Sequence, residues 1–185
     1  MKIYLHLLIL FGLSLLLLGC AIMKEDLRPI RDCPIEELLL DQADYPPNTT
    51  VNESRSPIAE KPSESAGGSA NYNGDATSQL VARHSSVDNA VREYEKWAEI
   101  AFEVDDVGGL WETPEVLSLR ETSASRQKVA CGNVVSFGQR CYIVGQYEEY
   151  FIFFWADISA EGINQELFRD LVIRIDRDMA ACLTR

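Results

Sequence analysis

The chain has 185 residues, with 29 Asp or Glu against 17 Lys or Arg, which gives a formal net charge of −12 at pH 7. Nucleic acid and anionic lipid both need their phosphates neutralised by Lys and Arg, so this acidic balance argues against either as a direct partner of the folded part. The length fits one domain with an additional N-terminal segment.

The first 20 residues have the pattern of an export signal, because Lys2 precedes an apolar run over residues 3–18. The run ends at Leu17-Leu18-Gly19-Cys20, which resembles the lipobox of bacterial lipoproteins. The resemblance implies a signal peptide over residues 1–19, lipidation of Cys20 and attachment of the mature chain to a membrane through that lipid. It therefore predicts an extracytoplasmic location in the bacterial cell envelope.

Two alternatives for this segment stay open. The stretch from Ile3 to Ile22 is about as long as a bilayer-spanning helix, so an uncleaved anchor fits, and so does an ordinary cleaved signal. Each of these readings carries the remaining chain across the membrane. Lys24, Arg28 and Arg31 follow the apolar run directly, and basic residues on that side oppose an anchor of this orientation.

The chain contains five cysteines, and four of them remain if Cys20 carries the lipid. An even number in an exported protein indicates two disulfides, for which three connectivities exist. Zinc binding is disfavoured, because the sequence has no Cys-x-x-Cys pair and His84 is the sole histidine after the signal. We therefore predict no metal and no cofactor.

Beyond the signal, residues 20–34 read as a tether of mixed charge, and residues 35–185 as a single domain. A brief strand is predicted over residues 49–52. Residues 53–77 are rich in Ser, Glu, Pro, Gly and Asn, a composition that buries little apolar surface, so we expect a mobile loop there. A strand over residues 78–84 follows this loop.

Apolar residues recur every three or four positions between Val87 and Phe102, which predicts an amphipathic helix capped by Ser85 or Ser86. A short strand is predicted over residues 116–119. The three tryptophans are candidate ligand contacts. Trp97 and Trp155 fall in the helix stripe and in a central strand, which predicts core positions, whereas Trp111 lies in a connection, where a ring can contact carbohydrate or protein.

The C-terminal third predicts three strands over residues 128–135, 140–147 and 150–158, with a solvated turn at Glu148-Glu149. Asn164 is a good N-cap for a final helix. The apolar stripe of that helix comprises Phe168, Leu171, Val172, Ile175, Met179 and Cys182. The order of elements predicts an α+β domain: an antiparallel sheet with a C-terminal three-strand meander and two amphipathic helices packed on it.

Cys131 and Cys141 fall in adjacent strands of the expected meander. If the turn centres near Ser136, the two cysteines lie opposite each other, within the Cα separation of about 5.5 Å that a disulfide needs. Elimination then pairs Cys33 with Cys182, which would tie the N-terminal segment to the last helix. A Cys182 that is an ordinary buried thiol on the apolar stripe is the alternative.

No catalytic constellation is recognisable in the sequence. His84 stands alone before a helix and no Gly-x-Ser-x-Gly motif exists, which favours a structural role for this histidine and a non-enzymatic protein. The alternative is an envelope hydrolase whose acid and base come from dispersed carboxylates, of which two must converge on one pocket. The candidates are Glu112, Glu148, Glu149 and Asp157.

The chain from Leu80 onward resembles small exported bacterial lipoproteins of unknown function. The resemblance is carried by His84-Ser85-Ser86 with the helix after it, by the Cys131/Cys141 hairpin, and by the closing Asp176-Arg177-Asp178-Met179 helix. More distantly, the element order is similar to PsbP-like domains and to the extracellular sensor domains of some mycobacterial kinases, which implies helices on an antiparallel sheet and transfers no catalytic residue. With the lipobox, these features favour a membrane-tethered binding, sensory or scaffolding module with a protein or small-molecule partner.

Overall fold

The computed structural model describes residues 31, 33–54, 62–103, 108–118 and 121–185. Six strands form one antiparallel sheet in the order β1-β2-β3-β6-β5-β4. The strands are β1 (Thr50–Ser54), β2 (Glu64–Tyr72), β3 (Asp75–Arg83), β4 (Arg126–Val134), β5 (Gly138–Tyr147) and β6 (Tyr150–Asp157). The helices are α2 (Val87–Ile100) and α3 (Gln165–Leu183), with 3-10 turns η1 (Ile35–Leu38), η2 (Gln42–Asp44) and η3 (Glu115–Leu117). The α+β prediction is confirmed, and its meander is β4-β5-β6.

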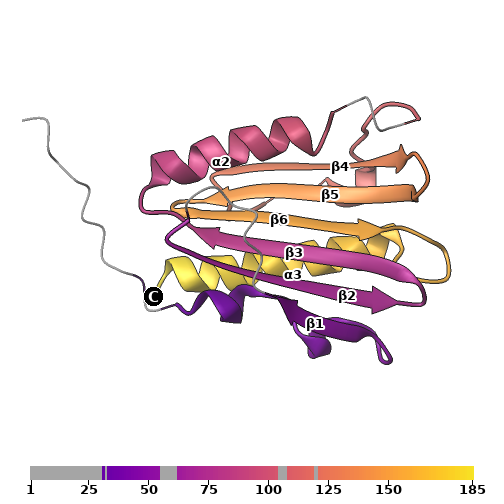
Figure 1. The fold of residues 1–185 in the computed structure, drawn as a ribbon, viewed down its shortest axis with the longest axis horizontal. Coiled ribbons are helices and arrows are strands. Elements are labelled where there is room, and N and C mark those ends of the chain that lie inside the picture. The colour runs from indigo at the N-terminus through magenta and orange to yellow at the C-terminus, as the bar shows by residue number, and fades with distance from the viewer. Residues whose placement is uncertain (1–30, 32, 55–61, 104–107, 119–120) are drawn as a thin grey trace, which may run out of the picture. The chain divides into compact units, whose positions relative to one another are not determined.

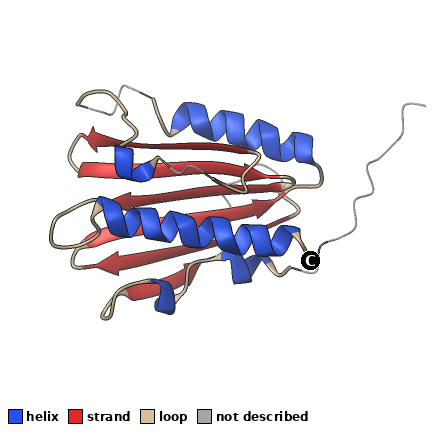
Figure 2. Ribbon diagram, turned by 180° about the vertical axis from the view of Figure 1, so that it is seen from behind, coloured by secondary structure: helices blue, strands red, loops and turns tan. Residues whose placement is uncertain are grey.

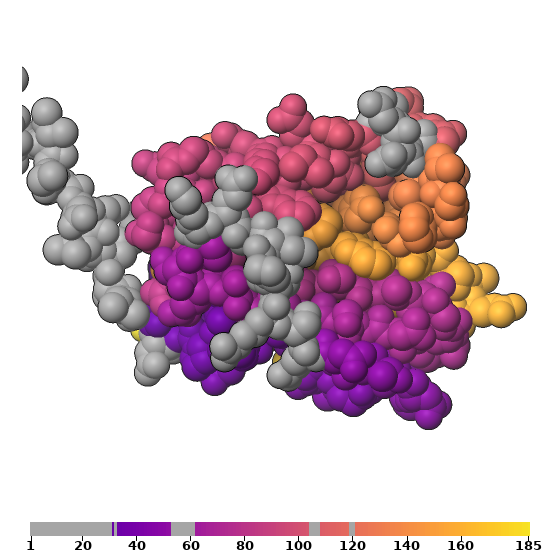
Figure 3. Space-filling view, in the orientation of Figure 1, coloured from indigo at the N-terminus to yellow at the C-terminus, as the bar shows by residue number. Residues whose placement is uncertain are grey.

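The two long helices lie on opposite faces of the sheet, which makes three layers (Figure 1, Figure 2). Side chains alternate between the two faces of a strand, so the central strand β6 supplies both cores. Ile152 and Phe154 face α3, whereas Phe151 and Phe153 face α2. The prediction that residues 150–158 form a central strand is therefore confirmed. Figure 3 shows the α2 side as a surface, with the atoms of α2 along its upper part.

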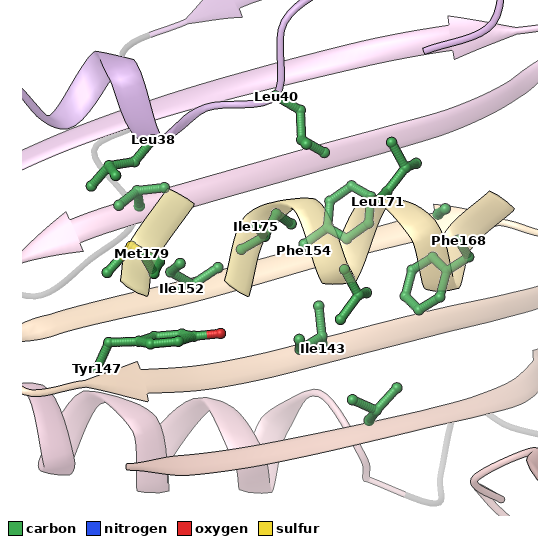
Figure 4. Close-up of a cluster of buried hydrophobic side chains, with 14 of the residues drawn as sticks. Leu38, Leu40, Ile143, Tyr147, Ile152, Phe154, Phe168, Leu171, Ile175 and Met179 are labelled. Carbon is green, nitrogen blue, oxygen red and sulfur yellow. The ribbon is translucent and has the colours of Figure 1, made fainter. Parts of the chain in front are cut away.

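The larger core lies between the sheet and α3 (Figure 4). Phe154 of β6 stacks on Phe168 of α3 with ring centroids 5.3 Å apart. The helix begins where the sequence predicts, because the Asn164 side chain accepts a hydrogen bond of 2.8 Å from the backbone N–H of Leu167. Every predicted residue of its apolar stripe is buried.

The prediction of a mobile loop over residues 53–77 is wrong for the part that is described, since residues 55–61 lie outside it. Residues 64–72 form β2, which pairs along its whole length with β3. Ala66 and Ala70 are buried in the same core as Leu38 of η1. The small side chains leave room for the η1 segment against the sheet, so a composition typical of loops here reflects close packing.

A second prediction is also wrong, because residues 115–117 form the 3-10 turn η3 rather than the start of a strand. The Pro114 that precedes η3 has a fixed φ and lacks an amide N–H, which suits the entry to a turn. Leu117 then points into the α3 core. Residues 119–120 lie outside the described part of the chain.

Tyr45 carries a pH-dependent contribution to stability. It is buried after η2, with its Oη 3.1 Å from Oγ1 of Thr77, and burial raises its pKa from 10.0 to about 12. The folded state therefore resists deprotonation, and stability that is present below pH 10 is lost as the pH rises to about 12. We expect Tyr45→Phe to remove about 2–3 kcal/mol of this loss, measured as the change in unfolding free energy between pH 9 and pH 12 in urea, with wild type alongside. Identical pH slopes for the two proteins would contradict the prediction.

Candidate functional site

Arg31 and Cys33, the first described residues, are fixed to one end of the domain. Cys33 forms a disulfide with Cys182 of α3, with Cα atoms 5.8 Å apart. Arg31 donates from Nε to Oε1 of Glu149 at 3.2 Å, and its other guanidinium nitrogens contact the Glu148 carboxylate and the Leu183 carbonyl. We call Arg31, Cys33, Glu148, Glu149 and Cys182 the N-terminal clasp. It corrects the predicted tether of residues 20–34, because residues 31, 33 and 34 belong to the domain.

The clasp also changes the interpretation of the turn between β5 and β6. Glu149 is buried rather than solvated, and Nη2 of Arg83 lies 3.8 Å from its Oε1 beside the Arg31 contact. The Arg83 guanidinium also lies over the Tyr150 ring, 5.5 Å from its centroid. Two arginines thus compensate a buried carboxylate, which would be costly without them.

His84 lies next to this clasp and is buried. Its backbone N–H donates to the carbonyl of Glu149 at 2.9 Å. Desolvation lowers the pKa of the imidazole, an effect that the nearby Glu93 carboxylate opposes. The Glu93 carboxylate itself accepts a hydrogen bond of 2.7 Å from Nε1 of Trp97. Nε2 of the imidazole is buried and has no hydrogen-bond partner among the described residues, and the structural role of His84 stays a prediction.

Of the four carboxylates proposed as dispersed acid and base, Glu148 and Glu149 share the Arg31 guanidinium, whereas Glu112 and Asp157 lie elsewhere. Glu148 and Glu149 precede the eight-residue strand β6, and Asp157 ends it. About 25 Å therefore separates Asp157 from the two glutamates. Asp157 accepts a hydrogen bond of 2.7 Å from Nε of Arg140. Glu112 lies at the outer edge of β4, in a bridge with Cys131. Of the four, only Glu112 lines one of the two hollows described below, so the described residues give the hydrolase alternative no support.

The most exposed large apolar side chains of the described residues gather at the end of the sheet opposite the clasp. They are Leu110 (74% exposed), Val135 (64%) and Phe137 (64%). Val135 and Phe137 lie in the β4–β5 turn, which Figure 3 shows in orange at the right-hand edge. We call this the hairpin end. Since β5 runs ten residues from this turn to the clasp, about 30 Å separates the two ends.

A cleft of about 380 Å³ lies at the hairpin end, between the segment before η3, the β4–β5 hairpin and the start of α3. Its lining residues are Gly109, Leu110, Glu112, Pro114, Cys131, Gly132, Asn133, Gln139 and Gln165. The wall next to β4 is held by two backbone hydrogen bonds between Glu112 and Cys131, of 3.0 and 2.8 Å. Behind it, the Cys131–Cys141 disulfide joins directly opposed residues with Cα atoms 4.0 Å apart, as the sequence predicts.

Sequence reasoning singled out only Glu112 and Cys131 among these lining residues. Asn133, Gln139 and Gln165 come from three different places in the chain, and isolated amides form no motif. Another hollow, of about 670 Å³, lies beside β1 and is lined by Asp41, Gln42, Ala43, Val51 and Asn52. Its carboxylate, that of Asp41, already accepts a hydrogen bond of 2.7 Å from the backbone of Ala43, which makes this hollow the weaker candidate.

The tryptophans differ from expectation in one case. Trp155 is half-buried outside both cores, and the Arg140 guanidinium lies 4.0 Å from the centroid of its ring. Trp97 packs on Phe153 with ring centroids 4.7 Å apart, in agreement with its predicted place in the core. Trp111 donates its indole N–H to the Glu103 carbonyl and joins the same core, so its ring is not a free platform for a partner.

The lipobox prediction stays a prediction, because Cys20 and all of residues 1–30 lie outside the described part of the chain. Within that part, no helix has the length and apolar character needed to cross a membrane. Nor do three or more His, Cys, Asp or Glu side chains gather there as a metal-binding group.

Comparison with known proteins assigns no function. No family model matches the chain, and no curated protein matches it. One solved structure that it resembles is an uncharacterized protein from Mycobacterium smegmatis, with 10% sequence identity and a TM-score of 0.41. The alignment covers 83% of this chain and 96% of that protein.

Proposed function

We propose that the protein is a lipid-anchored binding module of the bacterial cell envelope, with its ligand-binding region at the hairpin end. One observation carries the proposal: the residues that directly follow residues 20–30 are clasped at one end of the domain, while exposed apolar side chains and a polar cleft lie at the other. A lipid on Cys20 would then leave the hairpin end accessible to partners.

The predicted tether sets how far the domain extends from the membrane. Residues 20–30 precede the clasp, and a fully extended chain of that length spans at most about 40 Å. The hairpin end lies about 30 Å beyond the clasp. The domain would therefore act on partners close to the membrane surface. Both sensing and scaffolding fit this arrangement, and the identity of the partner decides between them.

The test of the anchor is the intact mass of the full chain purified from membranes. We expect a chain that starts at Cys20 with the added mass of a diacylglyceryl group, with the other cysteines alkylated only after reduction. Cys20→Ala should abolish the added mass and the membrane fractionation, because no thiol remains for thioether attachment. Ser14→Ala, in the same apolar run, is the matched control and should change neither. An unprocessed chain that starts at Met1 would remove the lipid-anchor proposal.

A further inference from the structure

We propose that the cleft at the hairpin end binds an extended, basic polypeptide segment of a partner protein, with an apolar side chain of that segment packed on Leu110. This inference deepens the proposed function. It rests on that function only for the location of the partner, close to the membrane surface. The cleft volume of about 380 Å³ falls in the range of ligand sites, about 300–1,000 Å³.

Three amide side chains favour a peptide as the occupant. The side chains of Asn133, Gln139 and Gln165 line the cleft, and none of them hydrogen-bonds another described residue. Each amide offers both a donor and an acceptor, which is the pair of groups that the main chain of an extended peptide presents. The backbone is held in place at two of these residues. The Asn133 carbonyl accepts a hydrogen bond of 2.9 Å from the Gly108 N–H, and the Gln139 carbonyl accepts one of 2.8 Å from the Ile158 N–H.

The charge of the residues in and beside the cleft favours a positively charged occupant. Glu112 is the one ionisable side chain among the residues that line the cleft, and it is exposed, with no ion pair to a described residue. Glu166 follows the lining residue Gln165 and is also exposed. In a chain with a net charge of −12, a cationic segment is attracted to this end and an anionic one is repelled. A lysine or arginine of the peptide would reach the Glu112 carboxylate.

The apolar rim of the cleft provides the contact for the apolar side chain of the peptide. Leu110 is 74% exposed on the wall of the cleft, and such a side chain gains free energy when a partner removes it from water. Val135 is a second exposed apolar side chain on the hairpin, whereas the Phe137 ring lies against the Arg140 guanidinium, 4.8 Å from its centroid. Exposed apolar side chains beside fixed polar groups are typical of protein interaction sites.

The experiment is a titration of the full chain in detergent micelles, with the side-chain amide NMR signals of Asn133, Gln139 and Gln165 as the readout. The probes are two blocked peptides, acetyl-Leu-Lys-Ser-Leu-Lys-amide and the same peptide with both lysines replaced by glutamates. We expect the basic peptide to shift these signals and the acidic one to leave them unchanged. Glu112→Gln and Leu110→Ser should each weaken binding by about tenfold, whereas Ile173→Ser, an exposed aliphatic control on α3, should not.

Four outcomes would overturn the proposal. They are no shift of the amide signals at millimolar basic peptide, equal shifts with the acidic peptide, equal weakening by the control variant, and shifts produced by phosphatidylglycerol vesicles alone, which would assign the hairpin end to a bilayer. Gln139→Ala is a second test of the cleft that leaves its charge and apolar rim intact. Because the titration needs no lipid on Cys20, its failure is distinguishable from failure of the anchor measured by mass.

Discussion

Replacing Cys33 and Cys182 together by alanine is expected to lower the free energy of unfolding by about 5 kcal/mol. The two cysteines are separated by 149 residues, so their bond closes almost the whole described chain into one loop. In the chain-entropy account, the unfolded state gains the most freedom when the longest loop is opened. Alanine is preferred to serine, because Cys182 is buried and a hydroxyl there would add a polar group to the core.

The second disulfide supplies the comparison. Cys131 and Cys141 are separated by 10 residues, and replacing both by alanine is expected to cost about 3 kcal/mol on the same account. Urea unfolding of the full chain in detergent, with both double variants and wild type under identical conditions, measures the two losses. A smaller loss for the long loop than for the short one would contradict the prediction, because the chain-entropy account assigns the larger loss to the longer loop.

The C-terminal half of the fold was predictable because its signals are local. The strands β4, β5 and β6 carry apolar and β-branched side chains and are joined by short turns, so their order and pairing follow from neighbouring residues. The opposition of Cys131 and Cys141 follows from the same turn geometry. Asn164 and the stripe after it place α3 by capping and periodicity alone.

The N-terminal half was not predictable in the same way. The strand β2 has small side chains with little apolar character, because the η1 segment packs on it, and this removes the periodic pattern. One signal was available: Asn73 and Gly74, with φ of 52° and 94°, join β2 to β3. Asn-Gly is the preferred sequence of a two-residue type I′ turn, and it predicts a hairpin even between weakly apolar strands.

The candidate site depends on contacts that no local pattern contains. The cleft brings together residues near positions 110, 133, 139 and 165, and the bridge between Glu112 and Cys131 closes it. Only the folded sheet reveals that Glu112 lines a cleft with three amides rather than facing a second carboxylate. Likewise, the sequence around Trp155 does not show that this ring lies outside the core beneath α2. The Arg140 guanidinium stacks on the ring instead.

Phe154→Ala and Trp155→Ala are expected to differ strongly although the residues are adjacent. Phe154 is fully buried and stacks on Phe168, so its truncation leaves a cavity in the α3 core and should cost about 3–5 kcal/mol. Trp155 is half-buried, and its truncation removes mainly the contact with the Arg140 guanidinium, worth about 1 kcal/mol. Urea unfolding of the two variants beside wild type measures the difference.

The comparison of Phe154→Ala with Trp155→Ala tests which residues of β6 face the α3 core. If the register were shifted by one residue, every side chain of the strand would change face, and Trp155→Ala would become the more damaging variant. The variant Arg140→Gln is the control for the tryptophan, because it removes the stacked cation and leaves the ring. A loss for Arg140→Gln close to that for Trp155→Ala would place the stabilising contact in the Arg140–Trp155 pair, although part of that loss would come from the ion pair of Arg140 with Asp157.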